Sequence, residues 1–87
     1  MQVHDDIAMW TASAAVVLDV RADLAQGGEP FVRIMEAAAQ IAPGQSLVIV
    51  APFEPAPLYG VLGGQGFAYA TARVADDEWV VRFSREW

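Results

Sequence analysis

The sequence contains no cysteine and no lysine, and its one histidine is His4. Without a thiol the chain can form no disulfide, offer no thiolate to a metal ion and carry no sulfur atom covalently. Without lysine it has no glycine-rich phosphate loop of the kind that ends in lysine. Its serines lack a histidine partner for nucleophilic catalysis, because the one histidine lies among the first residues. These absences predict a protein that is not an enzyme and needs no cofactor.

Basic residues are scarce as well. All five are arginines, against eleven Asp and Glu, so the formal net charge is −6. Affinity for nucleic acid comes largely from Lys and Arg that neutralise phosphates, and an anionic membrane surface repels an acidic protein. We therefore expect neither nucleic acid nor a membrane among the partners. His4 stands beside Asp5 and Asp6, but a competent metal site needs three or four convergent ligands, so no metal site is predicted.

Long hydrophobic runs are also absent. No stretch of about 18 consecutive apolar residues occurs, as a membrane-spanning helix requires. The first residues are acidic where a secretory signal would be basic, which favours the cytoplasm. The chain has 87 residues, of which 55% are apolar. One domain is expected, and without disulfides its stability must come from apolar burial, helped by self-association.

The first half of the chain predicts one strand and one helix. Residues 1–14 follow no clear period and form an N-terminal lead-in. The β-branched run of residues 15–20 predicts a strand, and residues 21–28 predict a loop. A helix is expected to begin at Glu29 and Pro30 and to stop at Pro43 and Gly44. Its apolar residues recur at steps of three and four, which makes one apolar face: Phe31, Ile34, Met35, Ala38, Ile41 and Ala42.

The second half predicts three further strands and a short helix. Residues 47–50 form a strand, and a helix runs from Pro55 to about Leu62. Residues 67–74 and 79–84 alternate between apolar and other side chains, which predicts an antiparallel hairpin. The order is β-α-β-α-β-β, so residues 15–87 are expected to form a single α+β domain. Its architecture is a two-layer α/β sandwich, with a four-stranded mixed sheet and two helices on one face.

The first two strands do not alternate, although one face of a two-layer sheet should contact water. Residues 16–18 and 47–50 are continuously apolar, which usually indicates burial on both faces. Three explanations stay open. The lead-in, with Trp10, folds over the open face, a second copy of the chain packs there, or the far-side residues are simply exposed.

Three short motifs in this order resemble the bacterial family known as domain of unknown function 2249, within the TusA/SirA-like superfamily of sulfur carriers. They are Leu18–Arg21 in the first strand, Pro43–Leu47 before the second, and Glu54–Tyr59 at the start of the second helix. The resemblance covers about residues 15–85. Two departures occur in the third motif, where Glu54 replaces the commoner aspartate and Phe53 the histidine that often precedes it.

The resemblance implies the TusA-like fold but not the chemistry of that superfamily. Its sulfur carriers place a cysteine-proline-x-proline motif at the start of the first helix, where the helix dipole lowers the thiol pKa. Glu29 and Pro30 match the second half of this motif, so Gly27 and Gly28 fall at its cysteine and first proline. Because the chain has no cysteine, covalent sulfur relay through it is excluded.

Arg21, Gly27 and Gly28 are the candidate ligand-binding residues. Arg21 is expected at the carboxyl end of the first strand, and the two glycines at the start of a helix with free backbone N–H groups. Such a group of donors suits an anion such as sulfate, phosphate or a carboxylate. In the structural alternative the glycines form a tight turn and Arg21 pairs with Asp23 or Glu29.

Five aromatic residues are candidates for an interaction surface: Trp10, Phe53, Tyr59, Trp79 and Trp87. Large aromatic side chains are enriched at protein interfaces, and Phe53 and Tyr59 belong to a proline-rich loop of the kind that often carries function. Closure of the core and a helix start explain the same residues in structural terms.

Two functions remain in view. The first is a non-catalytic binding or interaction module that self-associates as a homodimer and has a further, unidentified protein partner. The alternative is a protein that binds or senses a small anion or sulfur oxyanion through Arg21 and the start of the first helix.

Overall fold

The computed structural model describes residues 3–87, and the side chains of residues 6–87, so the side chain of His4 lies outside what it describes. The elements follow in the order α1 (Val3–Ser13), β1 (Val16–Asp19), α2 (Arg21–Ala25), α3 (Phe31–Ala39), β2 (Ser46–Ala51), α4 (Ala56–Gly63), β3 (Phe67–Ala75) and β4 (Glu78–Arg85). The sheet order is β1-β2-β4-β3. β1 and β2 are parallel, and the other two pairs are antiparallel.

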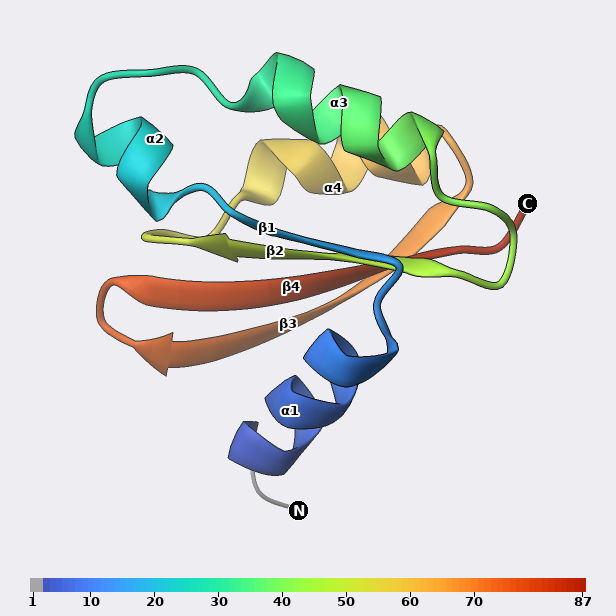
Figure 1. Ribbon diagram of the computed structural model, residues 1–87, viewed down its shortest axis with the longest axis horizontal. Coiled ribbons are helices and arrows are strands. Elements are labelled where there is room, and N and C mark those ends of the chain that lie inside the picture. The colour runs from blue at the N-terminus through green and yellow to red at the C-terminus, as the bar shows by residue number, and fades with distance from the viewer. Residues whose placement is uncertain (1–2) are drawn as a thin grey trace.

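The expected fold class is confirmed as an α+β domain with an open, four-stranded mixed sheet. α3 and α4 cover one face of the sheet, as expected, and α1 lies on the opposite face (Figure 1). The sequence predicted neither α1 nor α2.

The main core lies between the sheet and the pair α3 and α4. β2 contributes Leu47 and Ile49, and β4 contributes Val81 and Phe83, all of them buried. α3 presents Ile34 and Ala38 to these strands. The three-and-four spacing that predicted the helix therefore identified the face that is buried.

The boundaries of α3 differ from the expectation at both ends. Pro30 precedes the helix instead of occupying its first turn, and the helix ends at Ala39, before Pro43. The amides of Gln40 and Ile41 donate to the carbonyls of Ala37 and Ala38, at 3.0 and 3.1 Å. These tighter i-to-i−3 bonds close the helix early, yet they keep Ile41 buried in the core.

Residues 21–28, expected to be a loop, contain the short helix α2. The Asp19 carboxylate accepts the backbone N–H of Arg21 at 3.1 Å, which satisfies an amide at the start of the helix. Val20 is buried, and Leu24, four residues later, packs against the core. The four-residue spacing of Val20 and Leu24 was the one pattern in the sequence that could have indicated the helix α2.

α1 covers part of the open face of the sheet. Val48 and Val80 point away from the main core, yet they are 0% and 2% exposed. On the same face the Arg82 guanidinium lies 5.1 Å from the centre of the Trp10 ring. Of the three explanations for the non-alternating strands, cover by the lead-in therefore accounts for the middle of the sheet. At the edge, Val17 stays 42% exposed.

Replacement of Trp10 by alanine tests this cover. We expect Trp10→Ala to lower the free energy of unfolding by about 2 kcal/mol, since a half-buried tryptophan loses less contact than a fully buried one. Met9→Ala is the matched control, because Met9 is the preceding residue of the same helix and is 66% exposed. Its expected change is below about 0.5 kcal/mol. Equal losses in urea unfolding of the two variants would contradict the packing of α1 on the sheet.

Candidate functional site

The candidate site lies where the two parallel strands end. Because β1 and β2 are parallel, their carboxyl ends meet at one edge of the sheet, which is where open α/β sheets commonly bind ligands. The chain leaves β1 into α2 and leaves β2 into the proline-rich loop before α4. These two connections and the start of α3 stand apart from one another, and a cleft opens between them.

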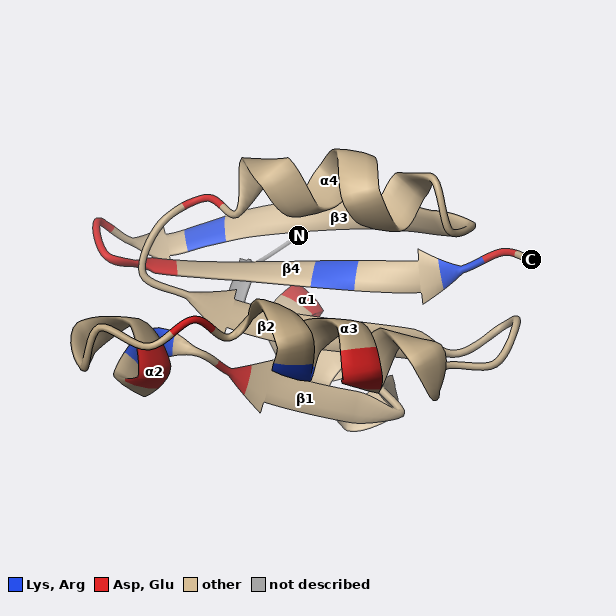
Figure 2. Ribbon diagram, turned by 90° about the horizontal axis from the view of Figure 1, so that it is seen from above, with Lys and Arg blue, Asp and Glu red and all other residues tan. Residues whose placement is uncertain are grey.

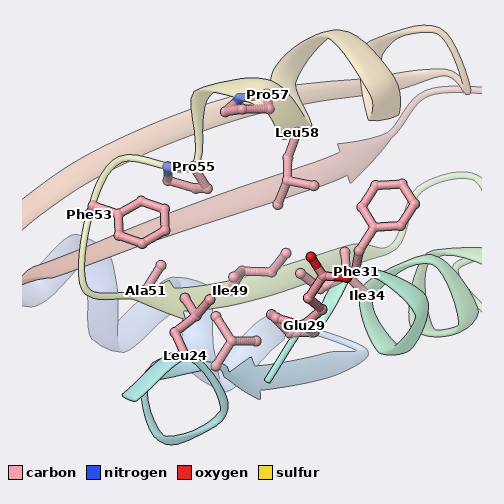
Figure 3. Close-up of a pocket in the computed structure, with 12 residues that line it drawn as sticks. Leu24, Glu29, Phe31, Ile34, Ile49, Ala51, Phe53, Pro55, Pro57 and Leu58 are labelled. Atoms are coloured by element: carbon pink, nitrogen blue, oxygen red, sulfur yellow. The ribbon is translucent and has the colours of Figure 1, made fainter. Parts of the chain in front are cut away.

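The cleft has a volume of about 520 Å³, and its lining is almost entirely apolar. Its floor is formed by Val20, Ile49 and Ala51, all buried. Phe53 and Phe31 stand on opposite sides of it in Figure 3. The remaining lining residues are Leu24, Glu29, Pro30, Ile34, Pro55, Pro57 and Leu58, of which only Glu29 is charged.

The two phenylalanines remain exposed although the cleft beside them is apolar. Phe31 is 49% exposed and Phe53 is 53% exposed. Phe31 continues the apolar face of Ile34 and Ala38 one turn toward the start of α3, where it lines the cleft and not the packed core. Phe53 lies in the loop between β2 and α4, before Pro55. Exposed aromatic rings next to a concave apolar surface are characteristic of a binding site.

Carboxylates gather at the same end of the molecule (Figure 2). Two of them are paired with arginines, Asp19 with Arg21 at 2.7 Å and Asp23 with Arg33 at 2.8 Å. Glu29 forms no ion pair within residues 6–87. The cleft is therefore apolar, and the charge in its lining is that of Glu29.

Arg21, one of the candidate anion-binding residues, already has partners in the chain. Its guanidinium donates to both carboxylate oxygens of Asp19 and lies 3.4 Å from Glu78. These hydrogen bonds hold the pKa of Asp19 below its ordinary value and raise that of Arg21. The expected alternative, a pair between Arg21 and Asp23 or Glu29, is wrong, because Asp23 pairs with Arg33.

The backbone groups of Gly27 and Gly28 are also in use. Their amides donate to the carbonyls of Leu24 and Asp23, at 3.1 and 2.8 Å, and both glycines precede Phe31, where α3 begins. Gly27 has a φ of 77°, which an L side chain rarely adopts. Anion binding here stays a prediction, and it requires that Arg21 exchange its carboxylate partners for the ligand.

The five candidate interface aromatics do not share one surface. Phe53 is at the cleft, Trp10 lies on the opposite face of the sheet, and Trp87 is 68% exposed beyond the end of β4. Trp79 is half-buried on β4, where the Arg73 guanidinium lies 5.4 Å from the centre of its ring. Tyr59 is half-buried on α4.

Tyr59 connects α4 to β3 through its ring and its hydroxyl group. Its ring stacks on that of Tyr69 with centroids 3.8 Å apart. The phenol donates to Glu54 at 3.0 Å, so the bond of 2.6 Å to Thr71 is one in which the threonine hydroxyl donates. Burial, with a contribution from Glu54, raises the pKa of Tyr59 above its usual value. These bonds fix the start of α4, which forms one wall of the cleft.

Within the described residues no group of three or more His, Asp and Glu side chains could hold a metal ion. No described helix has the length and apolar character needed to cross a membrane. The sequence analysis did not single out Leu24, Pro30, Phe31 or Ala51 as site residues. The sequence put Leu24 in a loop, Pro30 at a helix start and Phe31 on the apolar face of that helix, and only the three-dimensional arrangement shows that they line one cleft with Ala51.

Fold and site together define a small α+β domain with an apolar cleft at the carboxyl ends of its two parallel strands. The chain belongs to the family described as an uncharacterized conserved protein, DUF2249, whose model matches residues 17–85. The matched segment begins in β1 and ends with β4, and so leaves out α1. No curated protein and no solved structure matches the chain significantly.

The raised pKa of Tyr59 predicts how the stability of the protein depends on pH. Since its pKa is raised from 10.0 in the folded chain, stability is full below about pH 10 and falls at higher pH, where the unfolded chain loses its proton first. In Tyr69→Phe, Tyr59 is the sole tyrosine, and its ionisation, followed at 295 nm, should have a midpoint above 10.0. Tyr59→Phe should lower the free energy of unfolding at pH 7 by about 1 kcal/mol. A midpoint at or below 10.0 would contradict the burial of the phenol.

Proposed function

We propose that this protein is a non-catalytic interaction module whose cleft accepts a bulky apolar side chain from a segment of a partner protein. The observation that carries the proposal is the apolar cleft of about 520 Å³ with two half-exposed phenylalanines beside it. Phe31 and Phe53 expose apolar area to water in the free protein, and an apolar group placed between them removes that area from water. Burial of one large apolar side chain stabilises a complex by about 1.5–3 kcal/mol.

The chemistry of the lining favours a side chain over a polar metabolite. Small-molecule sites usually combine apolar walls with a few convergent polar groups that orient the ligand. Here Glu29 is the only charged residue in the lining, and hydroxyl, amide and guanidinium side chains are absent from it. Such a surface recognises size and apolar character, as the pocket for an anchor residue at a protein interface does.

The relation to sulfur carriers supports noncovalent binding at this end of the domain. We place the chain with the TusA/SirA-like superfamily, on the order β1-α3-β2-α4-β3-β4 and on the motif at Glu29 and Pro30. Those two residues line the cleft, so the region where the carriers hold their thiol borders an apolar surface here. The chain has no thiol, and its function rests on noncovalent contacts. The proposal includes a cytoplasmic location and self-association as a homodimer.

Two capped peptides test the proposal. Acetyl-Gly-Leu-Phe-Gly-amide carries a bulky apolar pair, and acetyl-Gly-Ala-Ala-Gly-amide lacks it. We expect the first to bind with a dissociation constant of about 1 mM and the second not to bind measurably, since so small a contact yields little net affinity. In a titration followed by ¹H–¹⁵N NMR, the amide shifts should centre on Leu24, Ala51 and Leu58.

Alanine variants locate the contact. Phe31→Ala and Phe53→Ala should each weaken binding of the apolar peptide about fivefold, which corresponds to about 1 kcal/mol. Val32→Ala is the matched control, because Val32 follows Phe31 on α3 and is 67% exposed, but does not line the cleft. Shifts that spread over other surfaces, or equal binding of the two peptides, would show that the cleft is not the binding site.

A further inference from the structure

At the end of the molecule that holds the cleft, the ion pairs within residues 6–87 leave some carboxylates without a guanidinium of their own (Figure 2). Arg33 is bound to Asp23, and Arg21 is shared between Asp19 and Glu78. One guanidinium between two carboxylates leaves a negative excess on that side of the cleft. Neither arginine forms a hydrogen bond to Glu29 or Glu54.

Glu29 and Glu54 are placed to act on whatever occupies the cleft. Glu29 is itself part of the lining, between the α2 end of the cleft and Phe31. Glu54 lies between Phe53 and Pro55, both of which line the cleft. It accepts the Tyr59 hydroxyl at 3.0 Å, a neutral donor that leaves its charge uncompensated. The two acids thus belong to separate segments that contribute to the cleft, Glu29 as a lining residue and Glu54 through its neighbours Phe53 and Pro55.

We propose that the partner segment carries lysine or arginine beside its apolar anchor, so that the anchor enters the cleft while the basic groups meet Glu29 and Glu54. This inference rests on the proposed function and specifies the chemistry of the partner. An apolar cleft selects for size, and charges around its mouth select the sequence that flanks the anchor. Glu29 lines the cleft, and Glu54 stands in the chain between the lining residues Phe53 and Pro55, so basic groups that flank the anchor can meet them.

The net charge of the whole molecule also favours a basic partner. At a net charge of −6 the protein repels acidic partners and attracts basic ones over about a Debye length, roughly 8–10 Å at 0.1–0.15 M salt. A second copy of this chain is disfavoured as the occupant, because the carboxylates at the cleft would meet another acidic surface.

Peptides that differ only in their flanking charge provide the test. We expect acetyl-Arg-Leu-Phe-Arg-amide to bind at least about tenfold more tightly than acetyl-Glu-Leu-Phe-Glu-amide at 20 mM salt. The preference should shrink to below about twofold at 0.5 M salt, because the groups involved are exposed to solvent. The neutral glycine-flanked peptide should lie between the two and change little with salt.

Charge-removing variants assign the effect to its residues. Glu29→Gln and Glu54→Gln should each reduce the preference for the arginine peptide about threefold. Glu36→Gln is the control, since it removes the same charge from the middle of α3, away from the cleft lining. Equal loss in all three variants would mean that only net charge matters and would overturn the local assignment.

The outcomes separate this inference from the proposed function. If the neutral peptide binds at the cleft and the flanking charge makes no difference, the inference is wrong and the proposed function stands. If the glutamate peptide binds best, the inference is likewise wrong. If no peptide binds but phenylethanol shifts the same amides, the cleft takes a small apolar molecule, and both proposals fail.

Discussion

The structure depends on one constraint, the need to cover both faces of the central strand β2. Five of its six residues are buried, and Leu47, Val48 and Ile49 are 0% exposed. Leu47 and Ile49 face α3 and α4, while Val48 faces the side where α1 lies. A two-layer domain supplies cover for one face only, so α1 is required for the other. β2 lies between β1 and β4 in the sheet, so the helices are arranged around the two faces of this strand.

The same constraint produces the cleft. After Ser46, β2 is apolar from Leu47 to Ala51, and this apolar character continues to Phe53 in the loop that follows. α3 begins at Phe31 and α4 at Ala56, and residues at both helix starts line the cleft together with Ala51 at the end of β2. The result is apolar surface that the domain does not cover, with two half-exposed phenylalanines beside it. Stability alone gives no reason to keep two such rings in water, and binding does.

The sequence predicts what depends on periodicity and local chemistry. Spacing of three and four identified α3, alternation identified the hairpin of β3 and β4, and prolines marked the starts of both covering helices. What it missed depends on contacts distant in sequence. α1 has no clear period, because only part of one side meets the sheet, through Trp10 and its neighbours. The apolar residues of the cleft were predicted in separate elements, Leu24 in a loop and Phe31 on a helix face, since a single sequence does not show which elements meet or where they stop.

Arg21, at the candidate site, gives a second example of contacts that the sequence did not predict. It was expected at the carboxyl end of β1 and lies there, but its partners were misjudged. Asp19 is two residues away and captures the guanidinium because α2 begins at once and turns the side chain back. Glu78 is the first residue of β4, and no local pattern connects it to β1.

The absence of cysteine has a further consequence at this end of the domain. A carrier that forms a covalent bond needs only one reactive atom and can tolerate a polar, open surface around it. A protein without a nucleophile must obtain its specificity from shape, apolar area and charge. This chain has all three at the start of α3. Pro30 and Phe31 contribute to an apolar wall, and beside it stands Glu29, which forms no ion pair within residues 6–87. In the proposed function, Glu29 and Pro30, which resemble part of the carrier motif, contact the partner without a reactive group.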